Sequence, residues 1–316
     1  MSISKEQIIE AHERIKPFIH KTPVLTSLTL NQFSGADLFF KCENFQKIGA
    51  FKIRGGMNAV LSLPKEKLTN GIATHSSGNH AQAIAYAARQ VGTKAYIVMP
   101  GNSPQVKIDA VKGYGAEITF CEPNLQARET ALQNIVDKTG AEFIHPFNDE
   151  RVIAGQATCA KELIEEIPGL EMILAPVGGG GLLSGTLLGA HYFSPNTKVY
   201  AGEPEGAADA VLSLKSGKIE AAPYVNTIAD GLLTKLGDIT FPIIQKYVTD
   251  ILTVTDEEII AALKLVYERM KIIVEPSCVV PFAAVLKNKE IFAGKKVGII
   301  LSGGNVDLKK LSEWFR

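Results

Sequence analysis

The stretch GAFKIRGG, residues 49–56, places one lysine, Lys52, between a phenylalanine and an isoleucine, with glycines on both sides. Lysine usually lies on a solvated face. In a cramped, partly apolar place the charged ammonium is disfavoured, so the pKa of Lys52 is expected to fall and its neutral amine becomes a usable nucleophile. Unless a binding site lies beside it, however, a surface lysine is the simpler interpretation.

A run of glycines follows an apolar, strand-like segment and precedes a helix-like one in APVGGGGLLSG. The run consists of Gly178, Gly179, Gly180 and Gly181. Four glycines carry a large entropic cost, which indicates a backbone shape that side chains would forbid. Successive N–H groups at a helix N-terminus form an anion site, and a phosphate is its natural occupant. The alternative is a plain tight turn. No GK[ST] follows, which argues against a nucleoside triphosphate with magnesium.

Two further strand-to-helix turns carry polar groups. THSSGNHAQ offers Ser76, Ser77 and Asn79, and IILSGGNVD offers Ser302. Simple helix capping would explain either turn alone. The carboxyl ends of parallel strands are, however, where ligands bind in α/β folds. Three such turns and a reactive lysine together suggest one shared ligand, an aldehyde that carries a phosphate, which is pyridoxal 5′-phosphate.

The hydrophobic pattern alternates strands with helices, which predicts an α/β fold with mostly parallel sheets. Residues 68–149 read as four strands joined by three helices, a compact unit of its own. We expect a large domain made of residues 1–67 and 150–316, with residues 68–149 inserted as a small α/β domain.

Composition excludes several classes of function. Lysine plus arginine and aspartate plus glutamate both number 33 in 316 residues, so the basic excess of a nucleic-acid-binding protein is missing. No apolar run is as long as a membrane span, and the polar N-terminal segment has no signal-peptide core. We therefore expect a cytoplasmic protein without nucleic-acid or membrane partners. The four cysteines are widely spaced, which is typical of buried, reduced thiols.

The motifs together resemble a known family, the fold-type II pyridoxal-phosphate enzymes, and most closely its serine racemase and threonine/serine dehydratase branch. The matching stretches span nearly the whole chain in order: KTPVLTS, FFKCENFQKIGAFKIRGG, SSGNHAQAIA, VGGGGLLSG, TIADGL, VEPS and LSGGNVD. The resemblance implies a tryptophan synthase β-like fold. Such a fold has two open, twisted, mostly parallel sheets flanked by helices, with the small domain inserted in the large one. It also implies a homodimer.

The resemblance assigns a role to each matching position. Lys52 is similar to the Schiff-base lysine, Phe51 to the residue flanking the cofactor ring, and Asn79 to the group facing the cofactor's 3′ oxygen. The glycines 178–181 with the Leu182 amide resemble the phosphate cradle, and Ser302 resembles the partner of the pyridine nitrogen. The positions similar to the substrate-binding region are Ser76, Ser77, Asn79, His80 and Arg128.

The implied chemistry starts with Lys52 removing the Cα proton from one face of a small β-hydroxy amino acid. Many pure threonine dehydratases resemble SAGNH, whereas this chain has Ser77 at the alanine position, and a hydroxyl there could serve the opposite face. Two opposed proton groups allow serine racemisation, and one suffices for elimination of water followed by loss of ammonia. Ala50 and Thr234 depart from the serines of animal racemases.

The substrate stays open among serine, threonine and 3-hydroxyaspartate. A threonine or threo-3-hydroxyaspartate dehydratase with little racemisation is the same-class alternative. The different-class alternative is a non-catalytic protein that binds a phosphate ligand.

The segment GEPEGAAD resembles a divalent cation site of the same family. The counterparts of its ligands are the carboxylates of Glu203 and Asp209 and the carbonyl of Ala207. Hard oxygen ligands of this kind suit Mg²⁺ or Ca²⁺. From spacing alone, a solvated acidic loop is the simpler interpretation.

Overall fold

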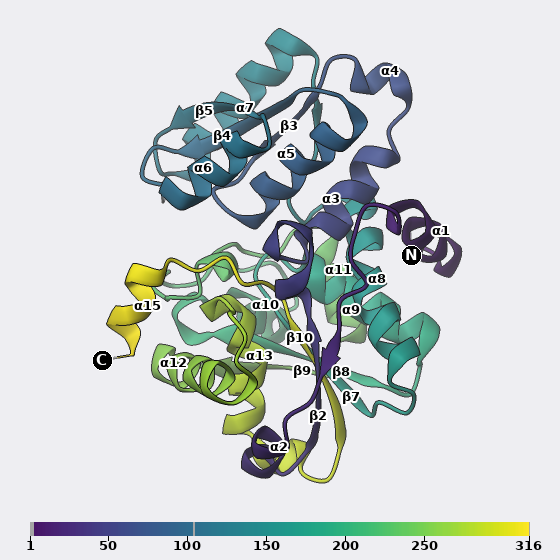
Figure 1. Ribbon diagram of the computed structural model, residues 1–316, viewed down its shortest axis with the longest axis vertical. Helices are drawn as coiled ribbons and strands as arrows, with labels where there is room; N and C mark the ends of the chain where they lie inside the picture. The colour runs from purple at the N-terminus through teal and green to yellow at the C-terminus, as the bar shows by residue number, and fades with distance from the viewer. Residues whose placement is uncertain (1–2, 104, 316) are drawn as a thin grey trace. The chain divides into compact units, whose positions relative to one another are not determined.

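A computed structural model describes residues 3–103 and 105–315. Its contacts divide the chain into two compact units. Unit 1 contains residues 1–19 and 52–155, and unit 2 contains residues 20–51 and 156–316. Each unit holds one β-sheet covered by helices, so the α/β class expected from the sequence is confirmed (Figure 1).

Unit 2 is built on a six-stranded sheet of order β1-β2-β10-β7-β8-β9, in which only the short β1 runs antiparallel to its neighbour. The strands are β1 (Val24–Leu25), β2 (Asp37–Cys42), β7 (Met172–Pro176), β8 (Lys198–Pro204), β9 (Asp250–Val254) and β10 (Lys296–Leu301). Central strands such as β7 are buried at every residue, because helices cover both faces of a parallel sheet.

The two faces of this sheet are covered by different helices. Alternate residues such as Phe40, Leu174 and Ile299 pack with α13 in the main core cluster, while α9 packs on β7 and β8. The helices wholly in unit 2 are α2 (Leu28–Ser34), α9 (Gly181–Phe193), α10 (Asp209–Ser216), α11 (Thr240–Tyr247), α12 (Asp256–Leu265), α13 (Pro276–Lys287), α14 (Lys289–Phe292) and α15 (Leu308–Trp314).

Unit 1 contains a four-stranded parallel sheet of order β5-β4-β3-β6. Its strands are β3 (Ile72–His75), β4 (Ala95–Pro100), β5 (Glu117–Cys121) and β6 (Glu142–Phe143). Its helices are α1 (Lys5–Ile15), α3 (Lys52–Leu61), α4 (Lys65–Leu68), α5 (Asn79–Val91), α6 (Gln105–Gly113) and α7 (Leu125–Thr139). Ala73 and Val98 face Leu132 of α7, so their neighbours along each strand face the opposite side, where α5 packs.

The boundaries of the two units differ from those expected from the sequence. The four strands and three helices expected within residues 68–149 are all present, but residues 1–19 and 52–67 group with them. The reason is that α3 packs along α5 and α1 packs on α3. The chain crosses between the units at Phe51–Lys52 and again within α8 (Glu150–Glu166), at Gly155–Gln156.

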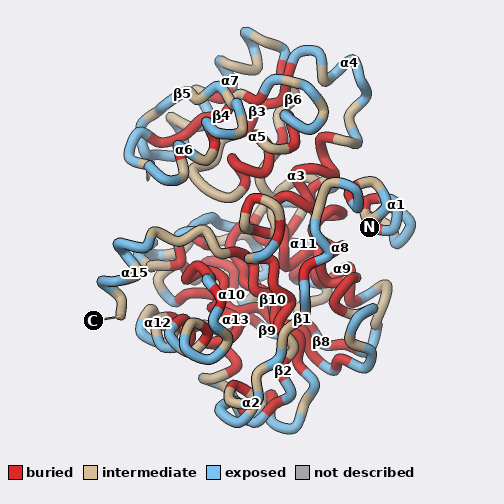
Figure 2. The backbone as a smooth tube through the Cα atoms, viewed as in Figure 1, coloured by how far each residue is buried: buried red, intermediate tan, exposed pale blue. Residues whose placement is uncertain are grey.

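In each unit the buried residues are concentrated in the strands and in the helices packed on them (Figure 2). The thiols of Cys42, Cys159 and Cys278 are buried and that of Cys121 is partly buried, and none of the four forms a disulfide within the described residues. Among the helices of the described residues, none combines the length and apolar character needed to cross a bilayer.

Candidate active site

The glycine loop, residues 178–181, joins the end of β7 to the start of α9. Gly180 is the N-cap of α9 with φ of 89°, a left-handed conformation that favours glycine. A Cβ on Gly180 would lie 2.9 Å from Thr240 Cβ, and one on Gly178 would lie 2.9 Å from the Leu232 Cα. No side chain caps the helix, so its first N–H groups, that of Leu182 included, form a cradle for an anion.

Ser302 lies at the same edge of this sheet as the glycine loop. It follows β10, which pairs in parallel with β7, and its side chain is buried. The backbone N–H of Phe51 donates a 3.0 Å hydrogen bond to the Ser302 carbonyl, and Ala50 forms a β-bridge with Gly303. Phe51, Ser302 and the glycine loop are therefore positioned by the ends of two adjacent strands, where α/β folds bind ligands.

Lys52 is the first residue of α3 in unit 1 and is half-buried. Its Nζ donates a 2.9 Å hydrogen bond to the Pro146 carbonyl, just beyond β6. A backbone carbonyl that accepts from the amine fixes the end of an otherwise flexible side chain. The lysine is thus held at the carboxyl-end edge of the four-stranded sheet.

The turn after β3 lies at that same edge. Ser76 and Ser77 are half-buried, and Asn79 opens α5. The N-cap of α5 is Gly78, which has no side chain to offer, so serine or asparagine does not cap this helix. The Ser76 hydroxyl instead accepts a hydrogen bond from the Gly78 N–H at 3.3 Å.

His80, the second residue of α5, is buried, with 2% of its surface exposed. Its Nε2 lies 3.2 Å from the Ile144 carbonyl, which can only accept, so Nε2 carries the proton. Burial, with a smaller contribution from the positive charge of Lys52, holds the pKa of His80 well below its usual value. The neutral ring then presents Nδ1 as a buried acceptor that has no partner within the described residues.

Arg128 lies on α7, half-buried, and its Nε donates a 3.4 Å hydrogen bond to the Asn124 carbonyl. Burial lowers the pKa of His75, and the charge of Arg128 lowers it further. Arg128 therefore lies close enough to His75, the residue that directly precedes Ser76, for its charge to act on that ring.

Two acidic residues of the expected cation site lie in unit 2, where β8 ends and α10 begins. Glu203 and Asp209 are 1% and 2% exposed, so the solvated acidic loop is excluded. The Glu203 carboxylate accepts hydrogen bonds from the N–H groups of Ala210 and Val211, at 2.7 Å and 3.0 Å. Burial raises the pKa of Glu203 to about 8, to which the charge of Asp209 contributes, and burial raises that of Asp209 to about 7.

The donor set matches a hard cation. Both carboxylates have further lone pairs available, and Ala207, whose carbonyl is the third expected ligand, lies between them in the chain. Within the described residues, no three histidine, cysteine, aspartate or glutamate side chains gather as a ligand group. The expected cation ligands are two carboxylate side chains and one backbone carbonyl, so the absence of a cluster of three side chains does not bear on them.

Apart from the expected cation ligands, the expected site residues are divided between the two units. Unit 2 holds Phe51, Gly178, Gly179, Gly180, Gly181, Leu182 and Ser302, and unit 1 holds Lys52, Ser76, Ser77, Asn79, His80 and Arg128. Sequence reasoning missed Thr240, whose hydroxyl donates a 2.9 Å hydrogen bond to the Gly179 carbonyl. It also missed His145, which organises the turn that holds Lys52. Neither residue belongs to a motif that could have revealed it.

The residues present fit pyridoxal 5′-phosphate. Unit 2 provides a glycine cradle that Cβ atoms would fill and a buried hydroxyl at Ser302, and unit 1 provides a half-buried amine at Lys52. The family model described as "Pyridoxal-phosphate dependent enzyme" matches residues 15–303. The chain belongs to the pyridoxal-phosphate-dependent enzymes.

Individual members of this pyridoxal-phosphate-dependent family match over nearly the full chain. The beta-hydroxyaspartate dehydratase of Paracoccus denitrificans is 52% identical over 306 residues, which cover 97% of each chain. The serine racemase of Dictyostelium discoideum is 50% identical over 316 residues, covering 99% of this chain and 98% of the relative. The structure of maize serine racemase superposes with a TM-score of 0.96 at 43% identity, covering 100% of this chain and 97% of that one.

Proposed function

We propose that this protein is a serine racemase that also dehydrates serine and threonine, converting L-serine to D-serine and to pyruvate plus ammonia. The observation that carries the proposal is the pair of proton-bearing groups, the Lys52 amine and the Ser77 hydroxyl, on one edge of the four-stranded sheet. The full-length similarity to serine racemases supports it.

When bound, the cofactor supplies a conjugated ring that makes the proton on the substrate's Cα removable. The glycine loop and the Leu182 amide would hold its phosphate, Ser302 its pyridine nitrogen and Asn79 its 3′ oxygen, beside Phe51. A neutral hydroxyl cannot keep a pyridine nitrogen protonated as a carboxylate would. More of the stabilisation of negative charge therefore falls to the positioned amines, hydroxyls and backbone N–H groups.

Lys52 takes the Cα proton from one face, and Ser77 delivers a proton to the opposite face in racemisation. Elimination needs only the first step, followed by loss of the β-hydroxyl as water. His80 supports the assignment of the substrate region, because its unpartnered Nδ1 is an acceptor that a hydroxyl, an ammonium group or a water can satisfy. Arg128 supplies positive charge for the substrate carboxylate.

A threo-3-hydroxyaspartate dehydratase with little racemisation is the second candidate. The 52% identity to the beta-hydroxyaspartate dehydratase of Paracoccus favours it, since that figure is as high as the identity to the serine racemases. The relative rates on several substrates separate the two candidates.

The deciding experiment assays purified, cofactor-loaded protein with L-serine, D-serine, L-threonine and threo-3-hydroxyaspartate. We expect D-serine to form from L-serine and pyruvate to form from both enantiomers. Turnover of 3-hydroxyaspartate without D-serine formation would establish the second candidate instead. Loss of the cofactor's visible absorbance and of all turnover in Lys52→Ala distinguishes an enzyme from a protein that only binds a phosphate ligand.

We also infer a divalent cation, Mg²⁺ or Ca²⁺, held by the carboxylates of Glu203 and Asp209 and the Ala207 carbonyl. The support is the burial of both carboxylates at one strand end, since buried charges are paired or coordinate metals. A homodimer, as the resemblance implies, and a cytoplasmic location complete the proposal. Light scattering on the loaded protein tests the dimer.

A further inference from the structure

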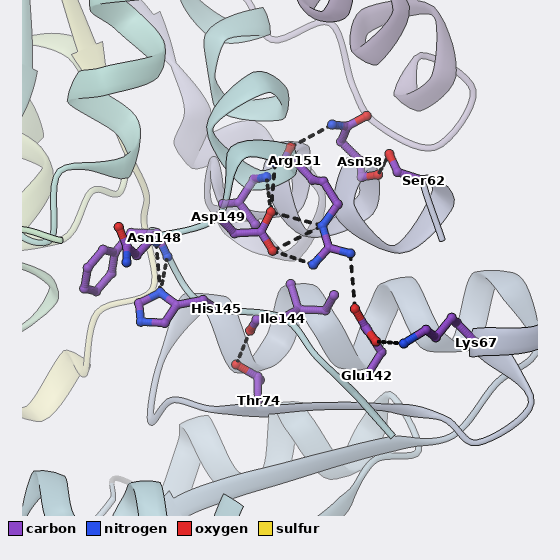
Figure 3. Close-up of polar contacts among 12 residues, drawn as sticks. Asn58, Ser62, Lys67, Thr74, Glu142, Ile144, His145, Asn148, Asp149 and Arg151 are labelled. Atoms are coloured by element: carbon purple, nitrogen blue, oxygen red, sulfur yellow. Dashed lines mark hydrogen bonds and ion pairs between the residues drawn. The ribbon is translucent and has the colours of Figure 1, made fainter. Parts of the chain in front are cut away.

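The turn at residues 145–148 is organised by one histidine (Figure 3). The backbone N–H groups of Phe147 and Asn148 donate hydrogen bonds to His145 Nδ1, at 3.2 Å and 2.9 Å. An N–H can only donate, so Nδ1 must be the unprotonated nitrogen of a neutral ring. One side-chain atom thus fixes two successive peptide groups of the turn.

Rings on several sides hold the His145 imidazole in place. The ring centroid lies 4.6 Å from that of Phe147, 5.6 Å from that of Phe143 and 6.2 Å from that of His75. All three contacts are edge-to-face, an arrangement that aromatic rings favour. The orientation of Nδ1 toward the turn is therefore set by packing and not by the two hydrogen bonds alone.

The residue enclosed by this turn is Pro146, whose carbonyl accepts the 2.9 Å hydrogen bond from Lys52 Nζ. The start of the turn is fixed independently, because the Ile144 carbonyl accepts from the Thr74 hydroxyl at 2.8 Å. Its end is fixed by Asp149, whose Oδ1 accepts the Arg151 N–H at 2.8 Å while the Arg151 guanidinium contacts both Asp149 and Glu142 (Figure 3). Between these anchors, His145 is the side chain that determines where the Pro146 carbonyl points.

We propose that His145 is a positioning residue for the reaction: its Nδ1 holds the 145–148 turn so that the Pro146 carbonyl binds the Lys52 amine whenever that amine is not bonded to the cofactor. This inference rests on the proposed role of Lys52. The carbonyl keeps the amine at one place between cycles and restrains its reactivity, because it accepts most strongly from the protonated amine, which has no lone pair for attack.

Two substitutions separate the acceptor from the ring. His145→Phe keeps the edge-to-face packing but removes Nδ1. His145→Asn removes the ring but keeps an acceptor, since an asparagine Oδ1 accepts the N–H two residues ahead in an Asx-turn. His145→Leu is a second replacement without an acceptor, with a different shape, and His191→Phe on α9 is the control for a histidine replaced in the other unit.

The first measurement uses the cofactor-free protein, in which trinitrobenzene sulfonate labels Lys52 and the exposed Lys65 serves as an internal reference. We expect the Lys52-to-Lys65 labelling ratio to rise about tenfold in His145→Phe and His145→Leu, as loss of a hydrogen bond from a charged donor implies. His145→Asn should stay within about twofold of the unsubstituted protein, and His191→Phe should match it.

The second measurement uses the loaded enzyme. We expect kcat to fall about tenfold or more in His145→Phe with KM little changed, because a small misplacement of a reacting group lowers the rate of the chemical step. His145→Asn should recover most of that loss. Equal labelling in His145→Phe and the unsubstituted protein, or a His145→Asn variant that behaves like His145→Phe, would overturn the proposal.

Borohydride trapping of the unsubstituted, loaded protein distinguishes a failure of the proposed function from a failure of the positioning role of His145. A cofactor adduct on a residue other than Lys52 defeats the proposed function itself. An adduct on Lys52 together with unchanged labelling in His145→Phe and His145→Leu defeats only the positioning role.

Discussion

Apart from the short antiparallel β1, the strands of both sheets run parallel, but the two sheets differ in how they are buried. In unit 2, β10 is buried from its second residue to its last, and β7 throughout. In unit 1, the edge strand β5 has no buried residue. The proposed phosphate cradle and Ser302 lie at strand ends of the more buried sheet, whereas the residues proposed to move protons lie at strand ends of the less buried one.

This difference suggests a division of labour. Elements with many buried apolar contacts open rarely, while those with few open at a lower free-energy cost. The groups of unit 2 proposed to bind the cofactor need one fixed geometry, and the core under β7 and β10 supplies it. The groups of unit 1 proposed to transfer protons are instead held by local hydrogen bonds, such as that from Lys52 to the 145–148 turn. Four predictions test whether binding and chemistry separate in this way.

The largest effect is expected from Ser77→Ala in unit 1. Removing the hydroxyl should lower serine racemisation by about 10²–10⁴, the usual contribution of one acid–base group. Elimination from L-serine and cofactor affinity should change only a few-fold, because Lys52 and unit 2 are untouched. Coupled assays for D-serine and pyruvate measure both activities, with Ser62→Ala as a control hydroxyl just after α3. Equal losses in the two activities would refute the assignment of opposite faces.

Gly180→Ala in unit 2 should weaken cofactor binding, which Ser77→Ala is expected to leave nearly unchanged. The added Cβ meets Thr240 Cβ at 2.9 Å in a left-handed conformation, so the loop must shift. We expect the cofactor's dissociation constant to rise about 10–100-fold, as the loss of one charged hydrogen bond implies. Gly169→Ala has a similar φ of 79° with open space around its Cβ, and should leave affinity unchanged. Fluorescence titration measures both.

Removal of the divalent cation should lower the stability of unit 2. A ligand present at 100 times its dissociation constant contributes about 2.7 kcal/mol, so EDTA should lower Tm by several degrees and Mg²⁺ or Ca²⁺ should restore it. Asp209→Asn should remove the response to EDTA. If Tm and activity are the same with and without EDTA, no functional cation occupies these ligands.

The smallest effect concerns pH and His80. Its folded pKa lies below the usual value, so the unfolded chain binds the proton first as pH falls. The stabilisation is present above about 6.5 and is lost as pH falls below it, by at most about 1.4 kcal/mol per pH unit. Urea unfolding of the cofactor-free protein at pH 5.5 and 7 should show this loss, and His80→Gln should reduce it. An unchanged slope in the variant would assign the loss to other groups, such as His75.

Local sequence was enough to predict the glycine loop, because its backbone shape is set by its own residues. The turn after β3 and the lysine at the start of α3 were singled out from their neighbours in the chain and from the resemblance, and their roles stay predictions. Lys41 shows the opposite case. Its place in a strand gives no sign that its side chain is completely buried and paired with Glu162 at 2.8 Å, more than a hundred residues away. The bond from Thr240 to Gly179 and the turn under Lys52 likewise depend on distant segments.

The boundary of the units shows the same limit. Residues 52–67 precede the first strand of the four-stranded sheet, and nothing in their pattern says which sheet they join. The tight packing of α3 on α5 decides it, with Gly56 so close to Ala83 that a Cβ on the glycine would lie 3.2 Å from the alanine Cβ. The hydrophobic pattern of a segment predicts its own secondary structure but not which distant helix it packs against.

The crossing at Phe51–Lys52 also limits where the backbone of the proposed Schiff-base lysine can lie. Phe51 is tied by its N–H to the Ser302 carbonyl, and the Cα of Lys52 follows at about 3.8 Å along the chain. The backbone of Lys52 is therefore tethered to the end of β10, although the lysine begins a helix of unit 1.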